Sequence, residues 1–319
     1  MVQYKEQLFF EHLGVENQKI LRSKVVCIVG IGALGTNTAE LLARTGVMEL
    51  ILIDRDFIEE DNLQKQALFT KNDINKMKVE AAKSHLGVIN PELKITIHQV
   101  DLDFDNIDLL KSDLILDCTD NMYTRFLINE YHVKTKTPWI YSSAIGSSGY
   151  VKVFNKLSSA CFSCIFQEPT SILGTCDTEG LLNTTARTIS SIQVTEAIKV
   201  LTKQDYSKDL IYIDLWKNKF NKIKVKKNNE CKACKKEFKY LTGTNSPSLI
   251  KLCGTNKYLI RTKKYNLEEL ENKLKNLGET ERTDSCLFFN GIVIFKDGRV
   301  MLKAKDEANA KSIISRYLE

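Results

Sequence analysis

Two pairs of cysteines carry the clearest chemical signal in this 319-residue sequence. Cys161 and Cys164 form one CxxC pair, and Cys231 and Cys234 form a second. Together they offer four thiolates, the tetrahedral set that structural zinc prefers. Because four protein ligands leave no coordination position open for a substrate, a bound ion would stabilise the fold rather than catalyse a reaction. The spacing favours this interpretation over a pair of redox dithiols.

A further cysteine, Cys176, stands apart from these pairs in the stretch ILGTCDTEG. A lone cysteine in a polar loop is either a candidate nucleophile or an incidental thiol, and its local sequence does not separate the two. The remaining cysteines are expected to have packing roles only: Cys27, Cys118, Cys253 and Cys286.

Three glycines in VVCIVGIGALG have the spacing of a phosphate-binding GxGxxG turn. In such a turn Gly30 permits the tight bend, Gly32 lets the backbone approach a phosphate, and Gly35 lets a helix pack on the strand. Asp54 follows about 20 residues later, where a ribose-binding acid is expected. The pattern favours a nucleotide site over a simple turn, but it does not separate ATP from NAD or FAD.

Polar residues further along the chain match the needs of a nucleoside triphosphate, which are donors and positive charge for the phosphates and acids for magnesium. The acid would be Asp120, and the donors would be Asn62, Lys65, Gln66 and Lys78. Isolated lysines are more often surface charges, so the value of these residues lies in their order along the chain.

The elements that must position these residues alternate between strands and helices. Short helices are expected at 2–13 and 16–21, and longer ones from about Ala33 and at 75–88, 123–134 and 184–202. Strands are expected at 25–29, 49–53, 94–100, 113–117, 138–144, 149–154, 210–214 and 220–225. The alternation predicts an α/β fold with a doubly wound, Rossmann-like, mostly parallel sheet. Asp120 then follows the carboxyl end of a strand, where ligands bind in open α/β sheets.

The turn-rich stretch YLTGTNSPS at 240–248 predicts a linker. We expect a nucleotide-binding domain over residues 1–240 and a small α+β domain over 249–319. In the second domain, a strand at 257–261 and a helix at 266–277 precede a hairpin and a final helix at 306–318. The hairpin would pair the apolar run Cys286–Phe295 with Arg299–Leu302 through an Asp297-Gly298 turn.

With 43% hydrophobic and 27% charged residues, the composition is that of an ordinary soluble protein. The uncharged stretches are too short for a membrane span, and the amino terminus lacks the apolar core of a signal peptide. We therefore expect a cytoplasmic protein without a membrane partner.

The net charge of +6 is unevenly placed, with lysines concentrated between Lys217 and Lys239. This stretch is either a solvated basic face or a docking surface for an acidic protein or for RNA phosphates. Because aromatic residues are sparse there, direct nucleic-acid binding is not expected.

The ordered motifs together resemble the ThiF/MoeB/HesA family, prokaryotic relatives of ubiquitin-activating enzymes. The resemblance covers roughly residues 2–239 and is carried by the two CxxC pairs and by GIGALG at 30–35, ID at 53–54, DNLQKQ at 61–66, KMKVEAA at 76–82, INP at 89–91, DCTDN at 117–121 and GTC at 174–176. The carboxy-terminal tail is similar to the small extension of some ThiF-like proteins rather than to a rhodanese domain.

The resemblance implies acyl adenylation. The carboxylate of a diglycine-ended ubiquitin-like or sulfur-carrier protein attacks the α-phosphorus of ATP and releases pyrophosphate. It also implies Mg²⁺, Zn²⁺ and a homodimer, and pathways such as thiamine or molybdopterin synthesis, tRNA thiolation or protein conjugation. By family position the nucleotide would be bound by Gly30, Gly32, Gly35, Asp54, Asn62, Lys65, Gln66, Lys78 and Asn121.

The catalytic residues that the resemblance implies are Asp120, which also holds magnesium, with Lys78, Lys65 and Arg125, which braces the same edge of the sheet. Cys176 resembles a family cysteine that takes the activated tail as a thioester or persulfide in some members.

Two positions depart from the family pattern. Lys65 replaces an arginine, and lysine cannot make the bidentate contact of a guanidinium. Glu6 replaces the arginine that the family provides to the partner subunit's ATP site, for which Lys5 or Arg22 are possible substitutes. These two positions leave open a non-catalytic scaffold that binds nucleotide and a ubiquitin-like protein. The glycine pattern leaves open an NAD-dependent oxidoreductase, and adenylation of a short peptide is a related alternative.

Overall fold

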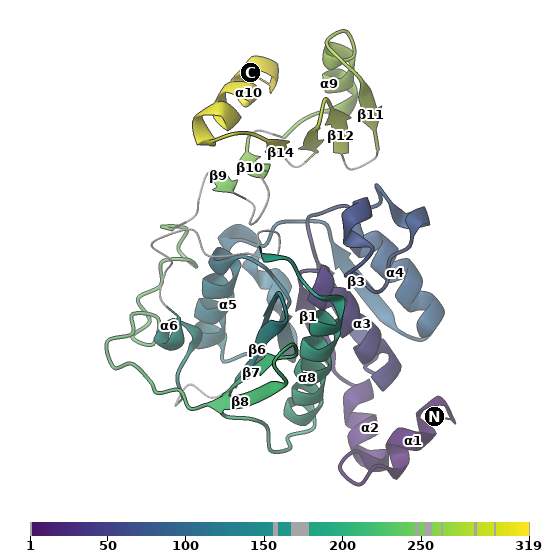
Figure 1. Ribbon diagram of the computed structural model, residues 1–319, viewed down its shortest axis with the longest axis vertical. Helices are drawn as coiled ribbons and strands as arrows, with labels where there is room; N and C mark the ends of the chain where they lie inside the picture. Colours follow the sequence, from purple (N-terminus) through teal and green to yellow (C-terminus); the bar gives the residue numbers. More distant parts are fainter. Residues whose placement is uncertain are drawn as a thin grey trace. The chain divides into compact units, whose positions relative to one another are not determined.

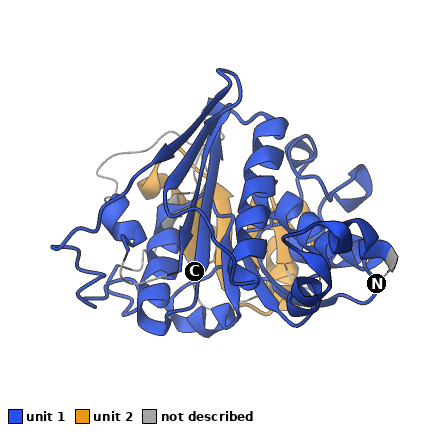
Figure 2. Cartoon of the chain, turned by 90° about the horizontal axis from the view of Figure 1, so that it is seen from below, with its two compact units in different colours: residues 1–245 blue, residues 246–319 orange. Residues whose placement is uncertain are grey.

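The structure is a computed structural model that describes residues 2–155, 159–166, 179–245, 249–251, 257–262, 264–283, 286–296 and 298–318. The chain divides into two compact units, residues 1–245 and 246–319, which are coloured separately in Figure 2. Cys176, Cys253 and Asp297 lie outside the described residues, so what the sequence predicts for them remains a prediction.

An eight-stranded sheet of order β3-β2-β1-β4-β5-β6-β7-β8 forms the centre of the first unit (Figure 1). The five strands from β3 to β5 are parallel to one another, and each later strand pairs antiparallel with its neighbour. The prediction of a mostly parallel α/β sheet is thus confirmed. The strands are β1 Val25–Val29, β2 Glu49–Ile53, β3 Lys94–His98, β4 Leu114–Asp117, β5 Trp139–Ile145, β6 Ser148–Phe154, β7 Leu210–Asp214 and β8 Lys219–Ile223.

Helices cover both faces of this sheet, because its central strands are apolar on both sides. In β1, Val26 and Ile28 pack into one core, while Cys27 and Val29 pack into the other. Fully apolar strands of this kind are typical of parallel sheets that are buried on two faces. The helical segments are η1 Val2–Tyr4, α1 Lys5–Phe9, α2 Gly14–Arg22, α3 Ala33–Thr45, η2 Glu60–Asn62, η3 Lys71–Asp73, α4 Lys78–Ile89, η4 Phe104–Leu110, α5 Met122–Thr135, α6 Phe162–Ile165 and α8 Asn183–Leu201.

The helix predicted to begin at Asn75 begins instead at Lys78. Asn75 has a positive φ of 68°, which is incompatible with a right-handed helix. A β-bridge between Phe57 and Met77 also holds the preceding residues in extended form. The first residue of α4 is therefore fixed beside the segment that follows β2.

The second unit contains an antiparallel six-stranded sheet of order β11-β12-β13-β14-β10-β9. Its elements are β9 Leu249–Lys251, β10 Lys257–Arg261, α9 Leu267–Leu274, β11 Thr280–Arg282, β12 Cys286–Phe289, β13 Ile292–Phe295, β14 Arg299–Lys303 and α10 Glu307–Leu318. Apolar residues of α9 and α10 pack with the sheet in one core. Every helix in the described part of the chain is too short or too polar to span a lipid bilayer.

The apolar run Cys286–Phe295, predicted to pair with Arg299–Leu302, is divided into two strands, and of these β13 pairs with β14. Asn290 and Gly291 both have positive φ, 47° and 78°, and form a tight turn that divides the run into β12 and β13. Asn-Gly is the preferred pair for this turn, because both residues tolerate the left-handed region.

Asp73 provides a test of the packing before α4. Its Oδ2 accepts hydrogen bonds from the backbone N–H of Thr70 at 2.9 Å and from its hydroxyl at 2.8 Å, and it lies 2.8 Å from Nε2 of His85. Lys76 donates to Oδ1 at 3.1 Å. Burial alone would raise the pKa of Asp73, but these hydrogen bonds outweigh it and hold the pKa below its usual value.

We expect Asp73→Ala to lower the free energy of unfolding at pH 7 by about 1–3 kcal/mol. Because the folded pKa is depressed, this stabilisation is present above the unfolded pKa of about 3.9 and is lost as the pH falls below it. Urea denaturation followed by tryptophan fluorescence reports on the first unit alone, since Trp139 and Trp216 both lie there. A difference between wild type and variant that stays constant down to pH 3 would contradict this; Asp205→Ala, at an exposed side chain, is the control.

Candidate functional site

The glycine loop joins β1 to α3, and its three glycines meet different surroundings. Gly30 has a φ of 88°, and a Cβ there would lie 2.8 Å from the carbonyl oxygen of Cys118. A Cβ on Gly35 would lie 1.9 Å from the carbonyl oxygen of Gly30, whereas one on Gly32 meets nothing within 4 Å. Packing therefore requires Gly30 and Gly35, while the space at Gly32 is open to a ligand, as a phosphate-binding turn needs.

Asp54 joins the end of β2 to this loop. Its Oδ2 accepts a hydrogen bond from the backbone N–H of Ile31 at 2.5 Å, and its Oδ1 accepts one from the backbone N–H of Asp56 at 2.8 Å. Burial raises the pKa of the Asp54 carboxyl, and Lys78 opposes this effect. The structure thus brings the predicted ribose acid against the predicted phosphate loop.

Lys78, the first residue of α4, is buried and contacts a carboxylate that sequence reasoning missed. Its Nζ lies 3.2 Å from Oδ2 of Asp56. Burial alone would lower the pKa of Lys78, but Asp56, Asp54 and Asp120 outweigh it and hold the pKa above its usual value. Lys78 therefore keeps its positive charge at neutral pH although it is buried.

Arg55 is a second residue that sequence reasoning missed. Its Nη1 lies 2.7 Å from Oδ1 of Asp101, and its Nε lies 3.6 Å from Oδ1 of Asp56. Burial opposes the charge on Arg55, but these acids raise its pKa. The signal that could have found Arg55 and Asp56 is the run of charged residues directly after a buried strand, in IDRDF.

The segment with Asn62, Lys65 and Gln66 folds into turns beside the first turn of α3. The carbonyl oxygen of Asn62 accepts hydrogen bonds from the backbone N–H groups of Lys65 and Gln66 at 3.1 and 2.9 Å. The N–H of Ala67 donates to Oγ1 of Thr36 at 3.2 Å. Within the described residues, the buried Oε1 of Gln66 has no hydrogen-bond partner.

The side chain of Asn62 is used within its own loop. Its Oδ1 accepts from the N–H of Glu59 at 3.2 Å, and its amide donates to Oδ1 of Asp61 at 3.0 Å.

The end of β4 presents Asp120 and Asn121 in different ways. Asp120 is exposed, whereas Oδ1 of Asn121 caps α5 by accepting the N–H of Thr124 at 2.8 Å. Arg125 is buried and donates from Nη2 to the carbonyl oxygen of Thr119 at 2.5 Å. Arg125 thus contacts the protein backbone and stabilises the segment that follows β4.

At the amino terminus, Glu6 is exposed on α1. Of the two suggested replacements for the family's arginine, Arg22 forms an ion pair with Glu92 at 3.1 Å. The other, Lys5, has its Nζ 5.9 Å from the centre of the Phe9 ring.

The four paired cysteines converge into one cluster, as their spacing predicts. The sulfur of Cys161 lies 3.7, 3.6 and 3.5 Å from those of Cys164, Cys231 and Cys234, and the sulfur of Cys164 lies 3.6 Å from that of Cys234. Four sulfurs at the Zn–S bond length of tetrahedral zinc would be about 3.8 Å apart. The geometry therefore fits a closed tetrahedral metal site.

This cluster lies far from the glycine loop. It packs against Val133 near the carboxyl end of α5, whereas Asn121 caps the amino end of the same helix. Twelve residues of helix separate the two positions by about 18 Å. A metal bound here would not reach the nucleotide.

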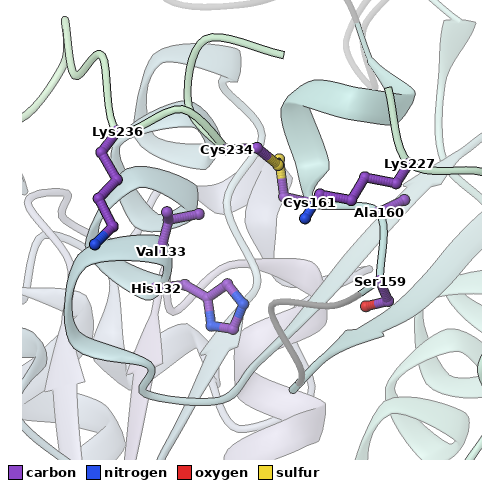
Figure 3. A pocket seen from close by; sticks show the side chains of 8 residues that line it. All are labelled: His132, Val133, Ser159, Ala160, Cys161, Lys227, Cys234 and Lys236. Carbon is purple, nitrogen blue, oxygen red and sulfur yellow. The ribbon is translucent and has the colours of Figure 1, made fainter. Parts of the chain in front are cut away.

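A small pocket lies beside the cluster, lined by Cys161, Cys234, His132 and two lysines, Lys227 and Lys236 (Figure 3). Nδ1 of His132 lies 2.7 Å from the carbonyl oxygen of Thr137, and burial lowers its pKa. None of the glycine-loop residues lines this pocket, so it is not the nucleotide site.

Comparison with known proteins agrees with this geometry. The chain is 34% identical to the sulfur carrier protein ThiS adenylyltransferase of Bacillus subtilis, over 99% of this chain and 98% of that protein. It is 33% identical to the molybdopterin-synthase adenylyltransferase of Salmonella typhimurium, over 73% and 96%. It is 30% identical to the adenylyltransferase and sulfurtransferase MOCS3 of Culex quinquefasciatus, of which it spans 57%.

Among solved structures, the crystal structure of Escherichia coli MccB with ATP matches with a TM-score of 0.65 and 20% identity, over 73% of this chain and 74% of that one. At this identity the match supports the fold alone. The model of the ThiF family matches residues 4–233. On this match and the near full-length similarity to the Bacillus subtilis protein, the chain belongs to the ThiF family.

Proposed function

We propose that this protein uses ATP to adenylate the C-terminal glycine of a sulfur-carrier protein. One observation supports the proposal above all others. The open glycine loop, Asp54, Lys78 and Asp120 gather where β1, β2 and β4 end, which is the binding crevice of an open α/β sheet. The full-length relative in Bacillus subtilis is an adenylyltransferase of the carrier ThiS.

In this proposal the backbone around Gly32 and the start of α3 bind the phosphates, and Asp54 binds the ribose. The carrier's C-terminal carboxylate attacks the α-phosphorus of ATP, a new phosphorus–oxygen bond forms, and pyrophosphate leaves with the electrons of the broken bond. Lys78 supplies fixed positive charge where negative charge develops on the phosphoryl oxygens. Lys65, Gln66 and Asn62 are assigned to the triphosphate by family position.

Two metals fit the residues present. The exposed carboxylate of Asp120, with Asn121 beside it, would hold magnesium, which neutralises phosphate charge when it is bound. The four cysteines would hold zinc, which would link α6 to the segment after β8. Arg125 braces the Asp120 edge through Thr119.

Cys176 is proposed as the thiol that receives the activated tail as a thioester or persulfide partner, on family position alone.

For the homodimer, support comes from Phe9 and Phe10 at the end of α1, which are 74% and 59% exposed. A second copy of the chain could bury these adjacent aromatic side chains, which are enriched in interfaces. A monomeric mass in sedimentation equilibrium would contradict the dimer.

A non-catalytic scaffold is the second candidate. It is favoured by Lys65 and Glu6, because both stand where the family has arginine. Such a scaffold would bind the carrier without releasing pyrophosphate.

The proposal is tested by ATP–pyrophosphate exchange with purified ThiS of Bacillus subtilis. Lys78→Ala should slow exchange on the order of 100-fold, because it removes a buried charge at the reacting phosphates. Lys83→Ala, an exposed lysine on the same helix, should leave the rate unchanged. Absence of exchange with folded wild type would rule out the function, and equal rates for both variants would rule out the role of Lys78.

Zinc is tested by metal analysis of the purified protein. We expect about one zinc ion per chain, loss of the ion in Cys234→Ser, and a lower melting temperature after chelation. Cys286→Ala, in the second unit, should retain the metal. Cysteines found oxidised in pairs, without bound metal, would instead favour redox dithiols.

Covalent loading is tested by incubating the protein with ATP and ThiS and running non-reducing gels. A band at the summed mass, present in wild type and absent in Cys176→Ala, is expected if this thiol receives the tail. The same band in both proteins would assign the linkage to another residue.

A further inference from the structure

The residue before Asp120 is held by a buried carboxylate at the end of β4. This residue is Thr119, and the carboxylate belongs to Asp117, which is 0% exposed. Oδ1 of Asp117 accepts the backbone N–H of Thr119 at 2.9 Å and its hydroxyl at 2.7 Å. The backbone carbonyl of Asp117 is itself fixed, since it accepts from Ser142 at 2.7 Å and from Gln193 at 3.1 Å.

Arg125 holds Thr119 at its remaining polar group. Its Nη2 donates to the carbonyl oxygen of Thr119 at 2.5 Å, and its Nε lies 3.7 Å from Oδ2 of Asp117. The guanidinium also lies 5.1 Å from the centre of the Tyr141 ring. The N–H, hydroxyl and carbonyl of Thr119 are thus all engaged by groups on β4 and α5.

On the other side of Asp120, Asn121 is fixed as the cap of α5 through its hydrogen bond from Thr124. Asp120 therefore lies between two anchored residues, while its own carboxylate stays exposed. These two anchors restrain the backbone of Asp120, and so the place from which its carboxylate projects, before any ligand binds.

The burial of Asp117 is unfavourable in itself. Burial raises its pKa to about 6, although Arg125 and Thr119 favour the ionised form. Within the described part of the chain, its Oδ2 accepts no hydrogen bond. A buried carboxylate with an unsatisfied oxygen costs stability, so folding alone does not favour an acid at this position.

We infer that Asp117 is a positioning residue that acts through Thr119 to direct the Asp120 carboxylate toward the nucleotide. The inference rests on the proposed function, in which Asp120 holds magnesium. Small misplacements of a group near the chemistry cost up to about 100-fold in rate.

The test measures ATP–pyrophosphate exchange with ThiS of Bacillus subtilis across a magnesium titration. Asp117→Ala should lower the rate about 10- to 100-fold and raise the magnesium concentration needed for half-maximal rate. Asp117→Asn, which keeps an acceptor for Thr119, should lose less. Asp113→Ala is the matched control, because Asp113 lies just before β4 at its other end, where it accepts from Val25 and pairs with Lys24.

A double-mutant comparison separates positioning from a general structural role. If Asp117 acts only through Asp120, Asp117→Ala should reduce the residual rate less than about 2-fold in an Asp120→Asn background. Equal losses in both backgrounds would overturn the inference.

Hydrogen exchange of the full-length protein gives a readout that does not depend on turnover. Amides of Thr119 to Asn121 should exchange faster in Asp117→Ala than in wild type or Asp113→Ala, with no fall in melting temperature for Asp117→Asn. Unchanged exchange in this segment would overturn the inference. Lack of pyrophosphate exchange in wild type would overturn the proposed function alone.

Discussion

The close approach of α3 to the ends of β1 and β4 is the constraint on which the rest of the first unit depends. A methyl group at Gly35 would overlap the carbonyl oxygen of Gly30, and one at Gly30 would press on Cys118. The helix can therefore begin directly over the strand ends, and its free N–H groups face the crevice there. Because β2 and β4 flank β1, Asp54 and Asp120 arrive at the same edge from opposite sides.

This edge concentrates charge that a folded core would otherwise avoid. Lys78 and Arg55 are held among Asp54, Asp56 and Asp101. Removing one member would leave its partner charged and partly desolvated, so the group is stable only as a set. The same set gives the site a fixed pattern of positive and negative charge, which suits a reaction whose substrate carries several phosphates.

The cysteine cluster joins two distant parts of the chain near the carboxyl end of α5. One pair lies at the start of α6 and the other in the segment after β8. The two pairs meet because both segments pack near Val133. Glu130 on α5 reinforces this arrangement, since its carboxylate accepts the backbone N–H groups of Lys239, Tyr240 and Leu241. The cysteine cluster and the edge that carries Asp120 thus lie at opposite ends of one helix.

The sequence alone determined the features that depend on neighbours along the chain. Apolar runs, the glycine spacing and the CxxC pairs are local, so they predicted the strands, the loop and the thiolate cluster. Tertiary structure decided what depends on strand order and on backbone conformation. A β-bridge brings Lys78 beside Asp56, which Arg55 also contacts, and Arg125 approaches Asp117 from the next helix. Asn75 precedes the start of α4, and Asn290 and Gly291 precede the start of β13. All three have positive φ, which the spacing of apolar residues does not reveal.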